Sequence, residues 1–266
     1  MKTRIISGLV MVPLLVIVYL GGYPLLAAAC LVGLVGLKEF YHGFEAMEVK
    51  ASYGIGVAAV VALYAINILG GRDGINAVNF KWHLLWIFGV ILVSLLYLFR
   101  IDERKLEDGM ATMIGILYVV FFSYHVVLVD QSPYPQMVWM ILLTAFITDI
   151  MAYFSGYLFG KNKLCPKISP KKTIEGSIGG TLGSIVCSGL FGYFAMPGLW
   201  IHCLIIGALG GILSQFGDLT ASIFKRKMGI KDYGNLIPGH GGILDRFDSV
   251  LFTAPLVYYY IVFVLA

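Results

Sequence analysis

Long apolar runs separated by short polar breaks constrain this chain more than any other feature. A helix that crosses a bilayer needs about 20 mostly apolar residues, and the runs have that length. The mean hydropathy is +0.87 and 13% of the residues are charged, whereas about a quarter are charged in soluble globular proteins. A helix satisfies its own backbone polar groups within lipid. We therefore expect a single all-α membrane domain without a separate soluble domain.

Reading the runs along the chain predicts about nine transmembrane helices. They cover roughly residues 5–21, 24–44, 52–70, 82–100, 109–130, 136–160, 174–195, 199–222 and 244–265. The first five form an N-terminal hydrophobic part, 1–135, and the last four form a part with the polar loops, 136–266. The first run follows Lys2 and Arg4 as a signal peptide would, but no small-x-small cleavage site follows, so we expect a retained span.

The basic residues predict the orientation. With the N-terminus in the cytoplasm, all of the 19 Lys and Arg residues except Arg72 and Lys81 fall on the cytoplasmic side. This asymmetry obeys the positive-inside rule and predicts a multi-pass protein of the cell (inner) membrane, with its active site facing the cytoplasm. It also explains the net charge of +4 without a nucleic-acid partner. The four cysteines have no metal-ligand spacing, and Cys165 lies in a loop placed in the reducing cytosol, so no disulfide framework is expected.

One carboxylate lies inside an apolar run. Asp149 falls within residues 141–159, where an ionisable side chain is costly and usually functional. On a helix, Tyr153, Gly156 and Gly160 would share its face, which is polar, thin and suited to lining a cavity. A buried Asp that is hydrogen-bonded to a neighbouring helix would explain the same residue, but we expect the cavity.

The polar loop from Lys161 to Gly176 carries five lysines and leads into the next run. Thr173 can cap the new helix, and Lys171 and Lys172 directly precede it. Helix N-termini attract phosphate, and neighbouring lysines strengthen such a site. Orientation charge beside anionic headgroups would explain the lysines alone, but not the order of these residues. Small residues at four-residue spacing then predict close helix packing: Gly176 with Gly180, and Gly179 with Gly183.

The densest polar stretch runs from Asp218 to Asp248. At its start, Ser222 and Lys225 share a helical face with Asp218. In its middle, three glycines surround His240, which allows the backbone to approach a ligand closely. A loop of self-paired surface charges would explain the charged residues but not this glycine-rich setting.

At the end of this stretch, Asp245 and Asp248 are three residues apart, on the opening turns of the last expected helix. That spacing predicts two carboxylates on one helical face. Mg²⁺ prefers such hard oxygen ligands and usually takes one or two carboxylates together with substrate phosphates. The nearby cations would neutralise phosphate charge; they are Lys225, Arg226, Lys231 and Arg246.

This stretch resembles the signature of the phosphatidate cytidylyltransferases (CDP-diacylglycerol synthases). The matching residues are Ser222-x-Phe-Lys225-Arg226, Lys231-Asp232-x-Gly234 and Ile237-Pro238-x-His240-Gly241-Gly242-Ile243-x-Asp245-Arg246-Phe247-Asp248. A second region is similar to the family as well: Asp149 to Tyr153, Gly156, Phe159-Gly160-Lys161 and Ser169-Pro-x-Lys172-Thr173-x-Glu175-Gly. The resemblance covers the C-terminal half from about Asp149. It departs from the family at Ile150-Met151, where a pair of small residues is usual.

The resemblance implies that CTP and phosphatidic acid react to give CDP-diacylglycerol and pyrophosphate, with Mg²⁺ and room for a second, monovalent ion such as K⁺. The implied metal ligands are Asp218, Asp245 and Asp248, with Asp149 as a further contributor. The implied catalytic residues are Asp218, Lys225, Arg226, Asp245, Arg246 and Asp248. The implied substrate-binding residues are Ser169, Lys171, Lys172, Thr173, Glu175, Ser222, Lys231, His240, Gly241 and Gly242. CTP would arrive from the cytosol and the lipid from the inner leaflet.

Other functions fit parts of the pattern. A secondary transporter of an anionic substrate would use an intramembrane carboxylate and broken helices, but no inverted repeat is visible. A CTP-dependent lipid or polyprenol kinase would also bring a cytidine nucleotide to a membrane lipid. The CDP-alcohol phosphotransferases fit less well, because their Gly-x-x-x-Asp-x-x-x-Asp pattern is absent. The glycine-rich runs 174–195 and 199–222 could pack within one chain or across a homodimer.

Overall fold

The computed structural model describes residues 13–70, 77–236 and 241–265. Contacts divide the chain into two compact units. Unit 1 comprises Met1–Pro135 and Lys227–Arg246, and unit 2 comprises Gln136–Arg226 and Phe247–Ala266. The described residues are mostly helical and contain one two-stranded antiparallel sheet, formed by β1 (Lys163–Cys165) and β2 (Ser169–Thr173).

The apolar runs form the expected helices. Over the described ranges, six segments are long and apolar enough to cross a membrane: Gly22–Glu45, Lys81–Phe99, Leu106–Asp130, Pro135–Phe159, Ile174–Ala195 and Pro197–Lys227. Two shorter apolar segments, Tyr53–Leu69 and Val250–Leu265, are also helical, as are residues 13–20. The prediction of an all-α polytopic membrane protein is confirmed. The count of nine spans and the orientation stay predictions, and the first expected span, 5–21, lies partly outside the described residues.

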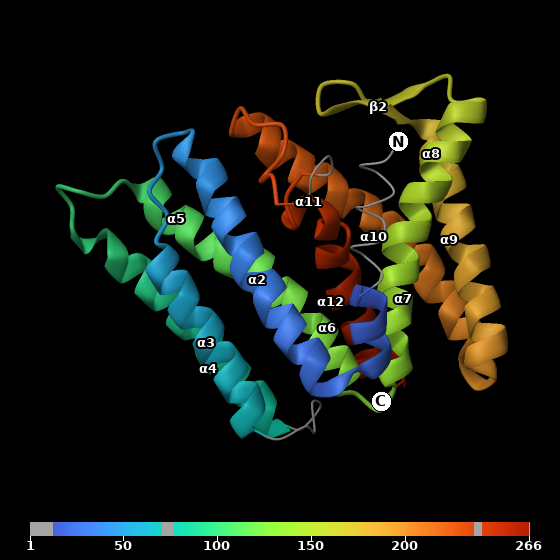
Figure 1. Ribbon diagram of the computed structural model, residues 1–266, viewed down its shortest axis with the longest axis horizontal. Helices are drawn as coiled ribbons and strands as arrows, with labels where there is room; N and C mark the ends of the chain where they lie inside the picture. The colour runs from blue at the N-terminus through green and yellow to red at the C-terminus, as the bar shows by residue number, and fades with distance from the viewer. Residues whose placement is uncertain (1–12, 71–76, 237–240, 266) are drawn as a thin grey trace. The chain divides into compact units, whose positions relative to one another are not determined.

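Unit 1 is a bundle of helices joined by polar contacts (Figure 1). Its helices are α2 (Gly22–Glu45), α3 (Tyr53–Leu69), α4 (Ala77–Leu96), α5 (Leu106–Gly115) and α6 (Phe122–Asp130), with a π-helical segment, Ile116–Phe121, between the last two. The Tyr41 hydroxyl of α2 donates to the Thr112 carbonyl of α5 at 2.6 Å, and the Trp86 indole of α4 donates to the Ala59 carbonyl of α3 at 2.8 Å. Such hydrogen bonds between helices add to packing within lipid.

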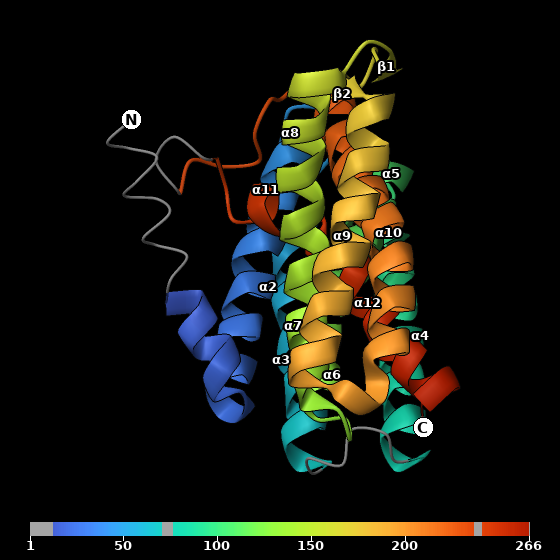
Figure 2. The same ribbon diagram turned by 90° about the vertical axis from the view of Figure 1, so that its right-hand side faces the viewer.

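Unit 2 carries the small sheet and the longest helix. Its helices are α7 (Val138–Leu142), α8 (Thr148–Phe159), α9 (Ile174–Ala195), α10 (Trp200–Lys227) and α12 (Val250–Tyr260), with π-helical segments at Leu143–Ile147 and Ile261–Leu265. Helices α8 and α9 lie side by side, and the hairpin of β1 and β2 lies at one end of this pair (Figure 2).

The glycine spacing predicted close packing, and the α8–α9 contact confirms it. A Cβ atom on Gly180 would lie 2.8 Å from the Thr148 carbonyl oxygen, and one on Gly176 would lie 2.7 Å from the Ala152 carbonyl oxygen. Both distances are too short for a real Cβ contact, and the obstructing atoms are backbone. The two helices therefore approach as closely as small residues allow, which fixes the walls of the site described next.

Candidate active site

A β-hairpin forms where the sequence suggested only a loop, between residues 161 and 176. The Glu175 carboxylate, in the first turn of α9, holds its base: Oε2 accepts the Lys161 backbone N–H at 3.1 Å, and Oε1 accepts the Asn162 side-chain amide at 2.8 Å. Thr173 caps α9 as predicted, because its Oγ1 accepts the Gly176 N–H at 3.1 Å. Arg226 at the end of α10 donates from Nε to the Ile168 carbonyl at 3.3 Å. The hairpin is thus fixed at its base and at its turn.

The hairpin and three helices line an open cavity of about 500 Å³. Its lining comprises Asp149, Ala152, Tyr153, Gly156 and Tyr157 of α8; Leu164, Ser169, Lys171, Lys172 and Thr173 of the hairpin; Gly176 and Ser177 of α9; and Gln215 and Asp218 of α10. The cavity expected beside Asp149 is therefore present, and its volume lies in the usual range for small-molecule sites. Gly160 was expected to share a helical face with Asp149. It does not, because α8 ends at Phe159 and the Gly160 backbone is extended.

A lysine–aspartate ion pair lies in the wall of this cavity. The Lys172 ammonium of the hairpin contacts Oδ2 of Asp218 on α10, and their side chains are 26% and 25% exposed. The Ser222 hydroxyl, one turn further along α10, donates to Oδ1 of Asp218 at 3.4 Å. The two polar stretches that the sequence showed separately, residues 161–176 and the start of 218–248, meet at this pair.

Asp248 lies in the same unit, packed against α10. It is 7% exposed, and a Cβ atom on Gly217 would lie 2.7 Å from its carbonyl oxygen. The charges of Asp218 and Asp149 repel its carboxylate, and the charge of Lys225 attracts it. Three carboxylates and at least two lysines of unit 2 therefore share one electrostatic environment.

The last helix begins later than the sequence predicted. Helix α11 covers only Leu244–Phe247, residues 248–249 form a turn, and α12 starts at Val250. Asp245 and Asp248 therefore do not lie on one continuous helix, and that expectation was wrong. The physical reason is local competition for hydrogen bonds: Oδ1 of Asp248 accepts the Ser249 N–H at 2.7 Å, and the Ser249 hydroxyl donates to the Ser214 carbonyl at 3.1 Å.

The glycine-rich part of the stretch belongs to unit 1. Oδ2 of Asp245 accepts the backbone N–H groups of Tyr233 at 2.8 Å and Gly242 at 2.9 Å, so this 8% exposed carboxylate ties two parts of the segment together. Gly241 has a φ of +83°, and a Cβ atom there would lie 2.7 Å from Oδ2 of Asp245, so no other residue fits well.

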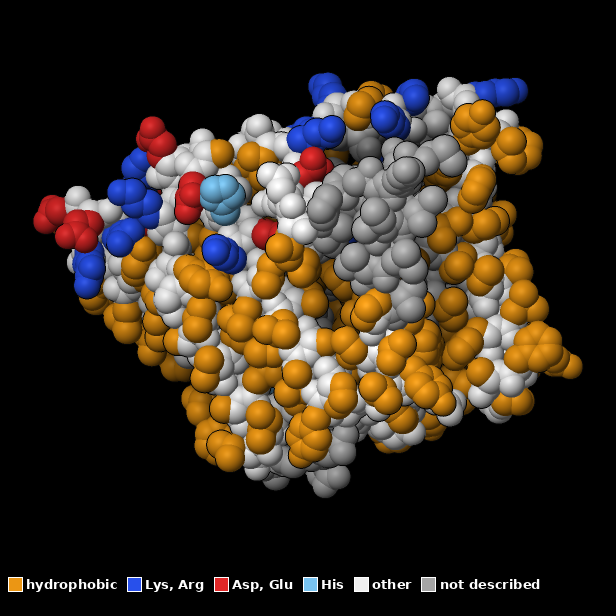
Figure 3. All heavy atoms as spheres, in the orientation of Figure 1, with side chains coloured by type: hydrophobic (Ala, Val, Ile, Leu, Met, Phe, Trp, Pro, Cys, Tyr) orange, Lys and Arg blue, Asp and Glu red, His pale blue; other side chains and the backbone are white. Residues whose placement is uncertain are grey.

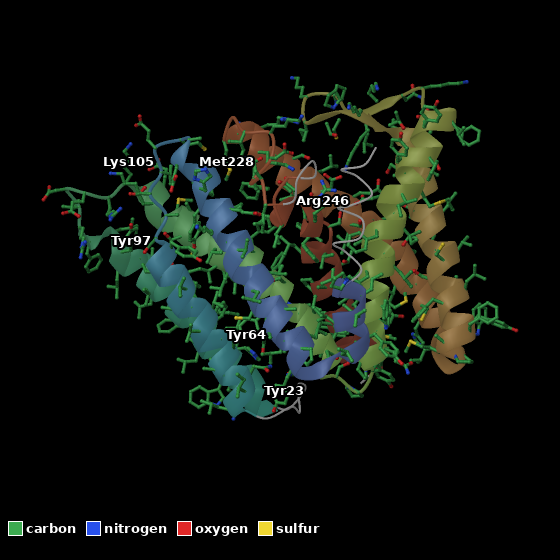
Figure 4. All side chains as sticks on the ribbon, viewed as in Figure 1. Tyr23, Tyr64, Tyr97, Lys105, Met228 and Arg246 are labelled. Atoms are coloured by element: carbon green, nitrogen blue, oxygen red, sulfur yellow. The ribbon has the colours of Figure 1, made fainter. Side chains whose placement is uncertain are left out.

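The remaining predicted residues of this segment differ in their exposure. Lys231 is exposed. Arg246, labelled in Figure 4, is half-buried, and its buried Nε has no hydrogen-bond partner among the described residues. His240 lies outside the described residues.

Comparison with known proteins decides the family. The sequence profile of the cytidylyltransferase family matches residues 2–264. The chain belongs to this family. It is 35% identical to a phosphatidate cytidylyltransferase of Staphylococcus haemolyticus, over 96% of this chain and 95% of that protein. It is 31% identical to the one of Bacillus subtilis, over 97% of both chains, and 30% identical to the one of Thermotoga maritima, over 97% and 95% respectively.

Family membership confirms the resemblance that the motifs indicated and extends it to the whole chain. The sequence signature covered only the C-terminal half, whereas the relatives align through the N-terminal helices as well. The chain is a nucleotidyltransferase of phospholipid biosynthesis, so the transporter and kinase alternatives are set aside.

The charge distribution of unit 2 suits a cytidylyltransferase, whose nucleotide is a polyanion. Lys163, Lys167 and Lys171 of the hairpin segment are exposed, and Figure 3 shows basic side chains along the edge that carries the hairpin. The helices beside it present mainly hydrophobic side chains on the same face. Cations therefore gather where the cavity is lined by Lys171 and Lys172.

A ready-made metal cage is absent: in residues 13–70, 77–236 and 241–265, no group of three or more His, Cys, Asp or Glu side chains could hold a metal ion. Mg²⁺ seldom needs one, because it commonly takes one or two carboxylates and completes its shell with water and substrate phosphates. Asp218 and Asp248 supply carboxylates of that kind within unit 2, and they repel each other. A donor set of this chemistry fits Mg²⁺.

Sequence reasoning missed Gln215, which lines the cavity on α10. Its side-chain amide donates to the Ser177 carbonyl at 3.2 Å and to the Thr181 hydroxyl at 3.0 Å, both on α9. A polar side chain within an apolar run was the available signal, the same one that identified Asp149.

Proposed function

We propose that this cytidylyltransferase joins CTP to phosphatidic acid at the cavity of unit 2, giving CDP-diacylglycerol and pyrophosphate. The observation that carries the proposal is the Lys172–Asp218 pair in the cavity wall, because a cation of the kind that binds phosphate lies there beside a carboxylate of the kind that binds Mg²⁺. The names and full-length alignment of the relatives support the same substrates.

The reaction is a substitution at phosphorus. A phosphate oxygen of the lipid attacks the α-phosphorus of CTP and forms a new P–O bond. The bond from that phosphorus to the oxygen that bridges to the β-phosphorus breaks, and pyrophosphate leaves with the electron pair. The attacking oxygen is already anionic at neutral pH, so the chain need not supply a strong base. The barrier lies in bringing two polyanions together, and fixed cations lower it by charge neutralisation and positioning.

The chain's own residues divide this work. Lys171 and Lys172 bind the triphosphate from the hairpin, with Ser169 and Thr173 beside them in the cavity lining. When a phosphate takes Lys172, Asp218 loses its present partner and becomes available to another cation. The other predicted substrate contacts are Lys225, Arg226, Lys231, Arg246, Ser222, Glu175, His240, Gly241 and Gly242. Glu175 and Arg226 also hold the hairpin in place.

Asp218 and Asp248 are the residues of unit 2 that would hold Mg²⁺ together with substrate phosphates, while Asp149 and Asp245 stay predictions from the sequence. When bound, the ion neutralises phosphate oxygens and aligns them for displacement. A second, monovalent ion such as K⁺ is compatible with this acidic set. Phosphatidic acid would reach the cavity from the inner leaflet along α8, where Tyr153 and Tyr157 are 68% and 78% exposed.

The proposed reaction is tested with CTP that is labelled in the cytosine. Purified protein, phosphatidic acid and Mg²⁺ should transfer the label into the lipid phase and release one pyrophosphate per lipid formed. A kinase or a transporter would leave the labelled nucleoside in water, and that result would reject the proposed function.

Cys165 offers a test of the proposed cytoplasmic orientation, because it lies in the hairpin and is partly accessible. We expect a membrane-impermeant maleimide to label the protein in inside-out vesicles and not in right-side-out vesicles. The other cysteines, Cys30, Cys187 and Cys203, lie within apolar helices, so Cys165→Ser should remove the signal. Labelling confined to right-side-out vesicles would reverse the topology.

A further inference from the structure

Unit 1 contains a buried carboxylate that the signature does not include. Glu39 lies near the end of the apolar helix α2 and is only 8% exposed. Its Oε1 accepts the backbone N–H of Ile243 at 3.0 Å, and its Oε2 accepts the backbone N–H of Leu244 at 2.8 Å. These bonds join residues more than 200 positions apart in the sequence.

Two signature glycines make room for this carboxylate. A Cβ atom on Gly242 would lie 2.4 Å from Oε2 of Glu39, and one on Gly234 would lie 2.7 Å from Oε1. The Glu39 carboxylate therefore occupies the space that side chains at both positions would need. Gly234 and Gly242 stand on opposite sides of the undescribed residues 237–240, so a single side chain contacts both parts of the segment.

The end of α2 supports the same segment over a further turn. The ring of Phe40 packs on the ring of Tyr233 with centroids 6.0 Å apart, and a Cβ atom on Gly43 would lie 2.7 Å from the sulfur of Met228. Figure 4 labels Met228 at this end of α2. The contact of Glu39 is thus part of a formed interface within unit 1.

The arrangement uses both carboxylate oxygens of Glu39 as hydrogen-bond acceptors. Both oxygens of Glu39 accept backbone N–H groups, and a buried charge is tolerated only when it is hydrogen-bonded in this way. Three consecutive N–H groups are held by two carboxylates: Gly242 by Asp245, and Ile243 and Leu244 by Glu39. The two carboxylates therefore hold this short backbone segment together.

We propose that Glu39 is a positioning residue for cytidylyl transfer. It does not touch substrate; it fixes the backbone of residues 241–244, from which Asp245 and Arg246 follow. The inference rests on the proposed roles of those two residues in the reaction. Through Glu39, the N-terminal helices take part in catalysis.

The test is Glu39→Gln, a substitution that preserves size. A glutamine has one acceptor oxygen and one donor NH₂ group, so one of the two amides must lose its partner. We expect kcat to fall about 10–100-fold, as for other residues that orient groups of a site, with the KM for CTP and the midpoint of thermal unfolding in detergent close to wild type. Hydrogen exchange at the Ile243 and Leu244 amides should accelerate.

Glu45→Gln is the matched control, because Glu45 lies on the same helix but is exposed beside His42; it should keep wild-type kcat. Gly234→Ala tests the same contact from the other side, because a Cβ atom there would lie 2.7 Å from Oε1 of Glu39, and it should reproduce the loss. Wild-type kcat in Glu39→Gln would overturn the inference, and so would a loss of activity that only follows the loss of folded protein. If Glu39→Gln fails to insert, Gly234→Ala decides by the same criteria.

One further variant tests the positioning role of Glu39 separately from the proposed role of Asp245. Asp245→Asn should be inactive if the proposed site is correct. Full activity in Asp245→Asn would reject the role of Asp245 itself. An inactive Asp245→Asn beside a fully active Glu39→Gln would reject only the positioning role.

Discussion

Asp218→Asn should lower kcat on the order of 10³-fold or more, while the protein still inserts and folds. Asparagine keeps the size of the side chain and can still accept from the Ser222 hydroxyl, which lies 3.4 Å away, but it removes the charge. That charge pairs with Lys172 and, in the proposed site, holds the cation that neutralises phosphate. Losing several kcal/mol of transition-state charge stabilisation corresponds to about three powers of ten in rate.

The measurement is transfer of cytosine label to lipid per folded molecule, with folding judged by a monodisperse profile in detergent. Asp102→Asn is the matched control, since Asp102 is exposed in the segment between α4 and α5 and the charge change is the same. It should keep wild-type kcat. An Asp218→Asn protein that retains more than about a tenth of the wild-type kcat would remove Asp218 from the catalytic set.

The membrane helices could be predicted because their signal is local. Hydropathy over about 20 residues identifies a span without any knowledge of its neighbours. The expected runs from 24–44 onward all overlap helical segments, although the last of them begins at Val250 instead of residue 244. The α8–α9 contact was also readable, because Gly176 and Gly180 repeat at the helical period that close packing requires.

The hairpin was not predictable, because the contacts that hold it are not local in the sequence. Its strands are short, and they contain lysines and a proline, residues that disfavour strands. The anchors that hold it are Glu175 at the base and Arg226 at the turn, and Arg226 is 58 residues away from the carbonyl it contacts. Tertiary contacts at such separations leave no periodic pattern in the sequence.

The candidate site was predictable as a list of residues but not as an arrangement. The sequence identified Lys172 and Asp218 through separate arguments, a helix N-terminus and a polar stretch, and only the fold pairs them. It placed Asp245 and Asp248 on one helix, where the structure has a turn at residues 248–249. Glu39 carried too weak a signal, because a glutamate at the end of an apolar run is usually a surface residue.

Lys172→Met should lower kcat/KM for CTP by about 10²-fold, the usual loss when one fixed group that stabilises developing charge is removed. Methionine keeps the length of the side chain and its apolar stem, so the cavity wall retains its packing. What disappears is the cation that now pairs with Asp218 and that the triphosphate would take.

Lys167→Met is the matched control for this loss. Both variants remove one positive charge from the same hairpin segment, but Lys167 is exposed and is not among the residues that line the cavity. If the lysines acted only by attracting anions to the membrane surface, the two variants would lose activity equally. A loss confined to Lys172→Met, and persisting at high salt where exposed charges are screened, would place the effect at the cavity.

The double variant Asp218→Asn with Lys172→Met then tests whether the pair works as one unit. When two residues act together, the double variant loses far less activity than the product of the two single losses. We expect the double variant to be little worse than Asp218→Asn alone, because without the carboxylate a cation at position 172 no longer has a partner to exchange for phosphate. Losses of kcat that multiply would show that the two residues serve independent steps. That result would contradict the proposal that Lys172 leaves Asp218 to bind the triphosphate.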